Sequence, residues 1–92
     1  MSQIHLQREH ELDRATLRKR VEKLAGQLKS THGGDYRWEG DKVHYSYSKG
    51  IDALLTLQPK EILVDVKLGM LMSMAKKPLQ REIERYLDEY LT

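Results

Sequence analysis

Apolar and polar residues alternate along the chain between Tyr36 and Leu68, in four runs that are separated by turn residues. A period of two residues is typical of antiparallel strands that bury one face and leave the other in water. The four runs therefore predict a four-stranded antiparallel meander. The alternation also assigns each side chain to a dry or a wet face, which limits the residues that remain free for chemistry.

The turns between these runs fit the same pattern. Gly40-Asp41 is a two-residue turn, Ser48-Lys49-Gly50 is a three-residue loop, and residues 58–61 form a four-residue turn. Such short connections fix the register of a hairpin. The directly opposed residues are then predicted to be Trp38 and Val43, Tyr36 and Tyr45, Tyr45 and Ala53, Val43 and Leu55, Leu57 and Ile62, Leu55 and Val64, and Ala53 and Val66. One register satisfies all three hairpins, so we expect these strands to form.

Three further elements flank the meander. Ile4 and Leu6 alternate with polar neighbours, which predicts a short strand of about five residues. A helix follows, capped by Asp13 and ended by Gly33-Gly34, and its apolar stripe consists of Leu17, Val21, Leu24 and Leu28. A last helix starts or kinks at Pro78, and its apolar face consists of Leu79, Ile83, Tyr86, Leu87, Tyr90 and Leu91.

This order of elements predicts a single α+β domain over residues 1–92, with a five-stranded antiparallel sheet and two helices. Both helices need an apolar surface and the sheet offers only one, so we expect both helices on the same face. The first strand must then join an edge of the sheet. We favour the edge formed by the last strand, because the long first helix can carry the chain across the sheet.

The amino-acid composition limits the classes of protein to which this chain can belong. Hydrophobic residues make up 39% and charged residues 33% of the 92 residues, which is typical of a soluble globular chain. No apolar run approaches the roughly 20 residues that cross a bilayer, and the first residues do not read as a secretory signal, so we expect no transmembrane segment and a cytoplasmic location. The absence of cysteine excludes thiolate chemistry, and a net charge of +2 gives no argument for a polyanion partner.

Several stretches, spread nearly end to end, are similar to one protein family. They are Ile4–His10, Leu12, Ala15, Val21, Leu24-Ala25, Leu28, Tyr36–Asp41, Gly50, Leu68-Gly69, Ile83 and Leu87. The most specific of them is Tyr36–Asp41, which reads Tyr-Arg-Trp-Glu-Gly-Asp ahead of a strand. On these residues the chain resembles the polyhydroxyalkanoic acid system proteins, small proteins found with bacterial polyester storage genes. The resemblance implies a role near polyhydroxyalkanoate granules or in their regulation, and it brings no catalytic residues.

Two places depart from the pattern of that family. Ala53 stands where a second glycine often follows the first, and Met72 and Met74 make the stretch after Gly69 richer in methionine. Neither departure affects the predicted fold.

Four aromatic residues share the dry face of the predicted meander, and they are Tyr36, Trp38, Tyr45 and Tyr47. Aromatic side chains on a sheet can stack on nucleic acid bases, but this face lies under the helices, so we expect core packing. A small apolar ligand could still bind in a groove between the first three of these rings and Tyr86 of the last helix.

The stretch after Gly69 is expected to form a turn or a short helix. It contains the apolar residues Met70, Leu71, Met72 and Met74, followed by the cations Lys76 and Lys77. The flexible methionines could fill the gap between the sheet edge and the last helix. Alternatively, the segment is an exposed apolar patch beside two lysines, suited to a granule surface or a partner protein. Such a short segment binds weakly alone, so dimers would be needed to raise its avidity.

The histidines and the wet-face polar residues form no recognisable reactive centre. The four histidines, His5, His10, His32 and His44, lack the spacing of metal ligands, so we expect surface or capping roles and no metal. His44, Ser46 and Asp65 could be assembled into a triad. However, they lie on an open sheet face that offers neither an oxyanion hole nor exclusion of water.

The first helix carries a run of basic residues, which are Arg14, Arg18, Lys19, Arg20 and Lys23. Neighbouring acidic residues dilute this run, so a solvated helix face is favoured over nucleic-acid binding. The free edge of the Tyr36 strand could pair with a second copy to form a homodimer, although Arg37 and Glu39 on that strand would oppose such pairing.

The sequence therefore favours a non-enzymatic accessory protein of polyhydroxyalkanoate storage, without a cofactor, that binds a granule-associated partner protein or the granule surface. The alternative is a small apolar-ligand carrier that uses the groove between the curved sheet and the last helix.

Overall fold

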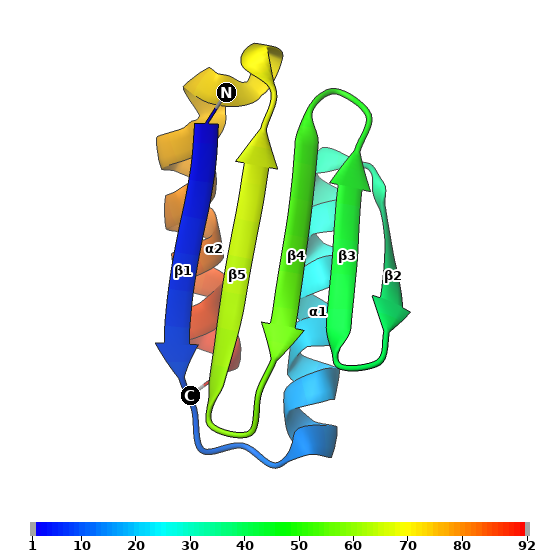
Figure 1. The fold of residues 1–92 in the computed structure, drawn as a ribbon, viewed down its shortest axis with the longest axis vertical. Coiled ribbons are helices and arrows are strands. Elements are labelled where there is room, and N and C mark those ends of the chain that lie inside the picture. The colour runs from blue at the N-terminus through cyan, green and yellow to red at the C-terminus, as the bar shows by residue number, and fades with distance from the viewer. Residues whose placement is uncertain (1, 92) are drawn as a thin grey trace.

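The expected sheet and both helices are present in the computed structural model, which describes residues 2–91 (Figure 1). The elements in chain order are the strand β1 (Ser2–Glu9), the helix α1 (Arg14–His32), the strands β2 (Asp35–Glu39), β3 (Lys42–Tyr47), β4 (Ile51–Leu57) and β5 (Glu61–Leu68), the 3₁₀ helix η1 (Met70–Ala75) and the helix α2 (Lys76–Tyr90). The prediction of an α+β fold with this order of strands and helices is confirmed.

The strands lie in the order β1-β5-β4-β3-β2, and every neighbouring pair is antiparallel. The prediction that the first strand joins the last is thus confirmed. β1 is eight residues long, longer than predicted, and pairs with β5 along its whole length. α1 then carries the chain across the sheet to the opposite edge, where β2 begins (Figure 1).

All seven predicted cross-strand pairs are confirmed. The backbone conformation of the turns explains this agreement, because Gly40 has a φ of 61° and Gly50 a φ of 119°. Both values lie in a region that residues with a side chain rarely adopt. Glycine at these positions therefore allows the β2–β3 and β3–β4 turns to have the lengths that the alternation requires.

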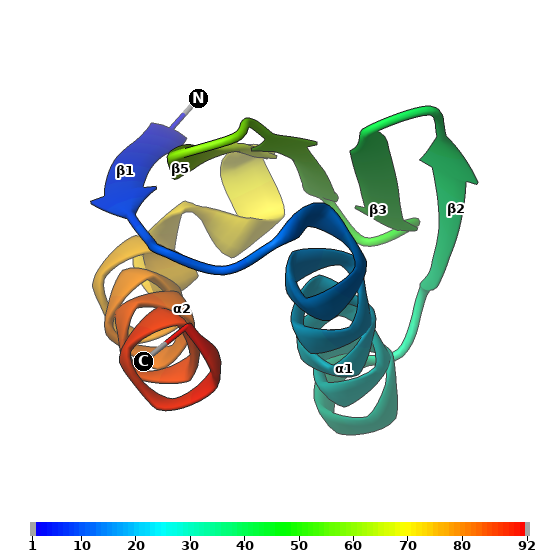
Figure 2. The same cartoon turned by 90° about the horizontal axis from the view of Figure 1, so that it is seen from below.

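Both helices cover one face of the sheet and leave the other open (Figure 2). α1 lies under β2 and β3, whereas α2 lies under β1. The dry-face residues of the strands are buried between the sheet and the helices, and they are Ile4, Val43, Tyr45, Ile51, Ala53, Leu55, Leu57, Ile62, Val64, Val66 and Leu68. The predicted apolar stripes of the helices supply the other half of this core.

The ends of the helices also follow from local residues. The carboxylate of Asp13 accepts a hydrogen bond from the backbone N–H of Thr16 at 3.3 Å, as an N-cap should. α1 ends at Gly33, whose φ is 91°. α2 begins at Lys76, two residues earlier than predicted, so that Pro78 lies inside the first turn, where its missing N–H has no helical partner to lose.

Candidate functional site

The segment η1 lies at one end of the molecule, between β5 and α2, and exposes apolar side chains there (Figure 1, at the top). Met70 is 84% exposed, Leu71 87% and Met74 94%. We call these three residues the η1 patch. Single large apolar side chains with this exposure are common, but three within five residues are unusual on the surface of a soluble protein, which makes this segment a candidate site.

The geometry of η1 explains which side chains point outward. A 3₁₀ helix has three residues per turn, so Met72 and Ala75 align on one side of it. Met72 is partly buried, packs against the core and lies against Gly50 in the β3–β4 turn. Backbone hydrogen bonds hold η1 there, because the N–H of Gly69 donates to the carbonyl of Gly50 at 2.9 Å. Packing at Met72 therefore anchors the segment while the η1 patch remains in solvent.

The sequence on either side of the η1 patch is basic. Residues 66–81 contain no acidic residue but include Lys67, Lys76, Lys77 and Arg81. Lys77 is exposed and Lys76 is half-buried. Neither lysine makes an ion pair with another residue of the part that the structure describes. The patch thus combines apolar side chains with nearby positive charge.

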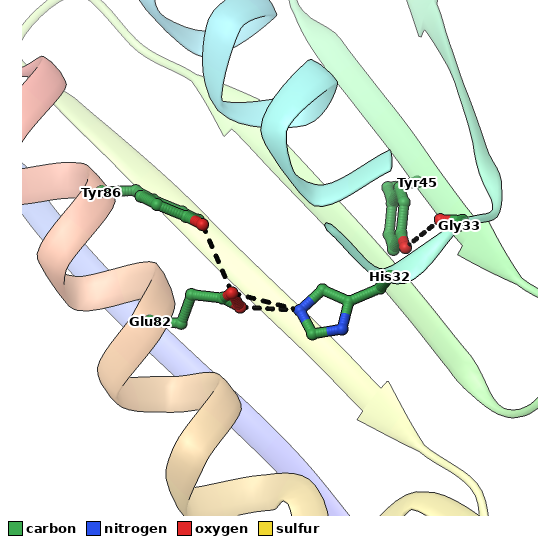
Figure 3. A network of polar contacts seen from close by, with 5 residues as sticks. All are labelled: His32, Gly33, Tyr45, Glu82 and Tyr86. Atoms are coloured by element: carbon green, nitrogen blue, oxygen red, sulfur yellow. Dashed lines mark hydrogen bonds and ion pairs between the residues drawn. The ribbon is translucent and has the colours of Figure 1, made fainter. Parts of the chain in front are cut away.

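Tyr45 and Tyr86, two of the four aromatic residues predicted to line a groove, are core residues (Figure 3). The hydroxyl of Tyr45 donates to the carbonyl of Gly33 at 2.5 Å, and burial raises the pKa of this phenol. The hydroxyl of Tyr86 donates to Glu82 at 3.3 Å. The prediction that Tyr45 packs in the core is confirmed.

The other two aromatic residues, Tyr36 and Trp38, lie on the edge strand β2 and contact α1 instead. The indole N–H of Trp38 donates to Glu22 at 2.7 Å, and the guanidinium of Arg18 lies 4.1 Å from the centre of the indole ring. Desolvation, with a smaller effect of Glu22, raises the pKa of Tyr36. α1 lies between this strand and α2 (Figure 2). The structure therefore does not bring the four rings together in one groove, and ligand binding by them stays a prediction.

A polar contact between the helices was not foreseen from the sequence. Nε2 of His32, the last residue of α1, lies 2.7 and 3.2 Å from the two carboxylate oxygens of Glu82 in α2 (Figure 3). The side chains are only 29% and 15% exposed. Fifty residues separate the two, so no local spacing could have indicated the pair. The contact adjoins a hollow of about 430 Å³ that both residues help to line.

His10 is the one buried histidine of the described chain, with 7% of its surface exposed. Its Nδ1 accepts from the backbone N–H of Leu12 at 3.1 Å, so Nε2 must carry the hydrogen that binds the carbonyl of Gln58 at 2.9 Å. Both ring nitrogens are therefore engaged by the backbone. The prediction of a surface or capping role is therefore wrong for His10, because its ring is buried where it joins the β1–α1 loop to the β4–β5 turn.

The wet face of the sheet holds two separate histidine–aspartate pairs, His5 with Asp65 and His44 with Asp52. His44 and Asp65, which with Ser46 could have formed a triad, are thus bound to different partners. Among residues 2–91 no group of three or more histidine, aspartate or glutamate side chains is placed to hold a metal ion.

The basic residues of α1 are largely used within the molecule. Arg14 pairs with Asp41 at 2.6 Å, Arg18 binds the carbonyl of Gly40, and Arg20 binds the carbonyl of Tyr90. Lys19 and Lys23 remain exposed. These contacts leave fewer free cations than the sequence suggests, which is consistent with an ordinary solvated face.

The free edge of β2 carries an ion pair between Arg37 and Glu39 at 3.2 Å. Charges along an edge strand disfavour pairing with another chain. A homodimer through this edge stays a prediction. No helix in the described part of the chain is long and apolar enough to cross a membrane.

Comparison with known proteins gives the biological setting. A search of curated proteins found no match to the chain. The model of one family, described as "putative polyhydroxyalkanoic acid system protein", matches residues 4–91. This match covers both helices and all five strands apart from the first residues of β1, so it includes the η1 patch and the contact between His32 and Glu82. The chain belongs to the polyhydroxyalkanoic acid system protein family.

Proposed function

We propose that this protein is a non-enzymatic accessory protein of polyhydroxyalkanoate storage, and that it binds the granule surface or a protein displayed there. The observation that carries the proposal is the η1 patch, in which Met70, Leu71 and Met74 are each more than four-fifths exposed. Because the chain belongs to the polyhydroxyalkanoic acid system family, the polyester granule is the surface that we expect these apolar side chains to contact.

The energetics support a weak, reversible attachment. Complete burial of one large apolar side chain contributes about 1.5–3 kcal/mol, so the three residues of the patch contribute about 5–9 kcal/mol before association costs. Those costs are about 4 kcal/mol or more. The exposed Lys77 adds attraction wherever the surface is anionic. A single patch is therefore weak, and a second copy on the same surface would raise the avidity.

The wet-face histidines and His10 give no support for catalysis. His44 and Asp65 have separate partners, and both nitrogens of His10 bind backbone groups. The two histidine–aspartate pairs lie on the open face of the sheet, where no neighbouring element of the described chain excludes water from a reaction. These arrangements favour a binding role over an enzymatic one.

The test compares a tagged protein with two variants in granule-bearing cells. Met70→Ser/Leu71→Ser/Met74→Ser removes the η1 patch, whereas Leu54→Thr/Leu63→Thr changes two partly exposed leucines on the open face of the sheet. We expect the native protein and the control to localise to granules and the patch variant to become diffuse. Diffuse native protein, together with no captured partner in pull-downs, would refute the proposal.

Polymer particles without protein separate the two forms of the proposal. Binding of the purified protein to bare polyester particles identifies the polymer as the target. Binding only to granules that retain their proteins identifies a granule-associated partner instead. In either case, the patch variant should lose the binding.

The second candidate function is the small-ligand carrier. The hollow beside His32 and Glu82 supports it, although its lining differs from the predicted groove at Tyr36, Trp38, Tyr45 and Tyr86.

A further inference from the structure

An open hollow lies on the helical side of the molecule, where α2 begins. Its volume is about 430 Å³. One wall is apolar and consists of Ile51 of β4, Met72 and Ala75 of η1, and Pro78 and Leu79 of α2. We call this space the α2 hollow. Its apolar wall and its size are typical of sites that take small organic ligands.

The rest of the lining is charged, and two of the positive charges have no carboxylate partner. Glu82 is held by His32 at 2.7 Å and by the hydroxyl of Tyr86 at 3.3 Å. Arg81 and Arg85 also line the hollow, and Arg85 lies 5.5 Å from the centre of the Tyr86 ring. Neither arginine makes an ion pair within residues 2–91, and like charges one helical turn apart repel each other. The hollow therefore presents two guanidinium groups, unpaired with any carboxylate of the described chain, beside an apolar wall.

The local field strengthens the preference for a negative ligand. The first turn of α2 contains no acidic residue and has no side-chain cap. Arg81 and Arg85 follow this turn, one helical turn apart from each other, so their positive charges add beside the hollow. These two cations outnumber the one carboxylate of the described lining, that of Glu82, so the charge of the hollow favours a negative ligand.

We propose that the α2 hollow binds an aliphatic carboxylate, with the hydrocarbon chain against Met72 and Leu79 and the carboxylate between Arg81 and Arg85. A guanidinium presents two parallel N–H donors that match the two oxygens of a carboxylate. This inference goes beyond surface binding and does not rest on it, because no residue of the η1 patch lines the hollow.

The test is a titration of the full chain followed by amide NMR shifts. Octanoate is the ligand probe, octanol has the chain without the charge, and acetate has the charge without the chain. We expect saturable shifts at Ile51, Met72 and Leu79 with octanoate, and affinities at least about tenfold weaker for octanol and acetate. The same spectra report whether each variant is folded.

Variants locate the site. Arg81→Gln/Arg85→Gln changes two exposed residues and should weaken octanoate binding about tenfold or more. Ala75→Phe should fill the hollow and abolish binding. The matched control Lys23→Gln/Lys60→Gln removes two exposed charges that do not line the hollow, and it should bind as the native protein does.

Three results would overturn the proposal. They are the absence of saturation with octanoate, equal affinity for octanol, and undiminished binding by Arg81→Gln/Arg85→Gln. The variant that lacks the η1 patch should retain octanoate binding, and its loss would place the ligand on the patch rather than in the hollow.

Discussion

His10 joins two loops through hydrogen bonds to the backbone, and its replacement should cause a stability loss that can be measured. His10→Ala removes the hydrogen bonds to Leu12 and Gln58, which have lengths of 3.1 and 2.9 Å. Each such bond contributes about 0.5–1.5 kcal/mol net, so their sum is about 1–3 kcal/mol.

The surroundings of His10 decide whether a further penalty applies. A hollow of about 400 Å³, lined by His10, Leu12 and Gln58, lies beside the ring. Water can therefore reach the backbone groups that the substitution frees, and the full cost of leaving them buried without partners is avoided. We expect the free energy of unfolding to fall by about 1–3 kcal/mol, and the Tm by about 4–8 °C for each kcal/mol.

Urea unfolding followed by the fluorescence of Trp38, the only tryptophan of the chain, measures this loss. The matched control is His5→Ala, which removes an exposed histidine paired with Asp65 on the open face. Exposed pairs contribute about 0–1 kcal/mol, so the control should stay close to the native protein. Equal losses in the two variants would show that the contacts of His10 do not stabilise the fold.

Two further predictions concern backbone strain and pH. Gly34→Ala should lower the free energy of unfolding by about 2 kcal/mol or more, because the φ of Gly34 is 87° and an added Cβ would lie 2.5 Å from the carbonyl oxygen of Ser46. Gly40 has a φ of 61° and open space around it, so Gly40→Ala should lower the free energy of unfolding by only about 1 kcal/mol. Equal losses in urea unfolding would contradict this explanation of the two glycines. Burial raises the pKa of Tyr45, so the folded state keeps a proton that the unfolded state loses near pH 10. The contribution of Tyr45 to stability should therefore be constant below that pH and should decrease above it. Tyr45→Phe should reduce this alkaline decline, and an unchanged slope of stability against pH would refute the assignment.

Residues of η1 take part in both proposed binding sites. Its outer side chains, Met70, Leu71 and Met74, form the η1 patch, while Met72 and Ala75 line the α2 hollow. A ligand in the hollow would thus contact the inner side of the segment whose outer side faces a granule or a partner. Variants of the two sides are separable, because no residue belongs to both.

The aromatic residues show how far sequence reasoning could go. The alternation correctly assigned Tyr36, Trp38 and Tyr45 to the helix-covered face. It could not show that α1 covers β2 while α2 covers the opposite edge, which separates Trp38 from Tyr86. Helix placement depends on how whole apolar surfaces fit together, and no short stretch of sequence contains that information.

The order of strands and the register of the meander could be read from the chain alone. Each hairpin depends on residues within a few positions of each other, namely the turn residues and the in-and-out alternation. The place of β1 followed instead from the need of both helices for the one apolar face and from the length of α1. The same local rules predicted the N-cap at Asp13 and the end of α1 at Gly33. The family resemblance was also visible in the sequence, and the match over residues 4–91 confirms it.

Tertiary structure alone decided which of these residues are available for function. The sequence left two possibilities for Met70–Met74, and packing resolved them by placing Met72 against Gly50 and leaving the η1 patch in solvent. It also brought His32 to Glu82 across fifty residues and placed Arg81 and Arg85 beside an apolar wall. Side-chain alternation determines the face on which a residue lies, but exposure and pairing depend on what packs against that face, because those contacts join parts of the chain that are distant in sequence.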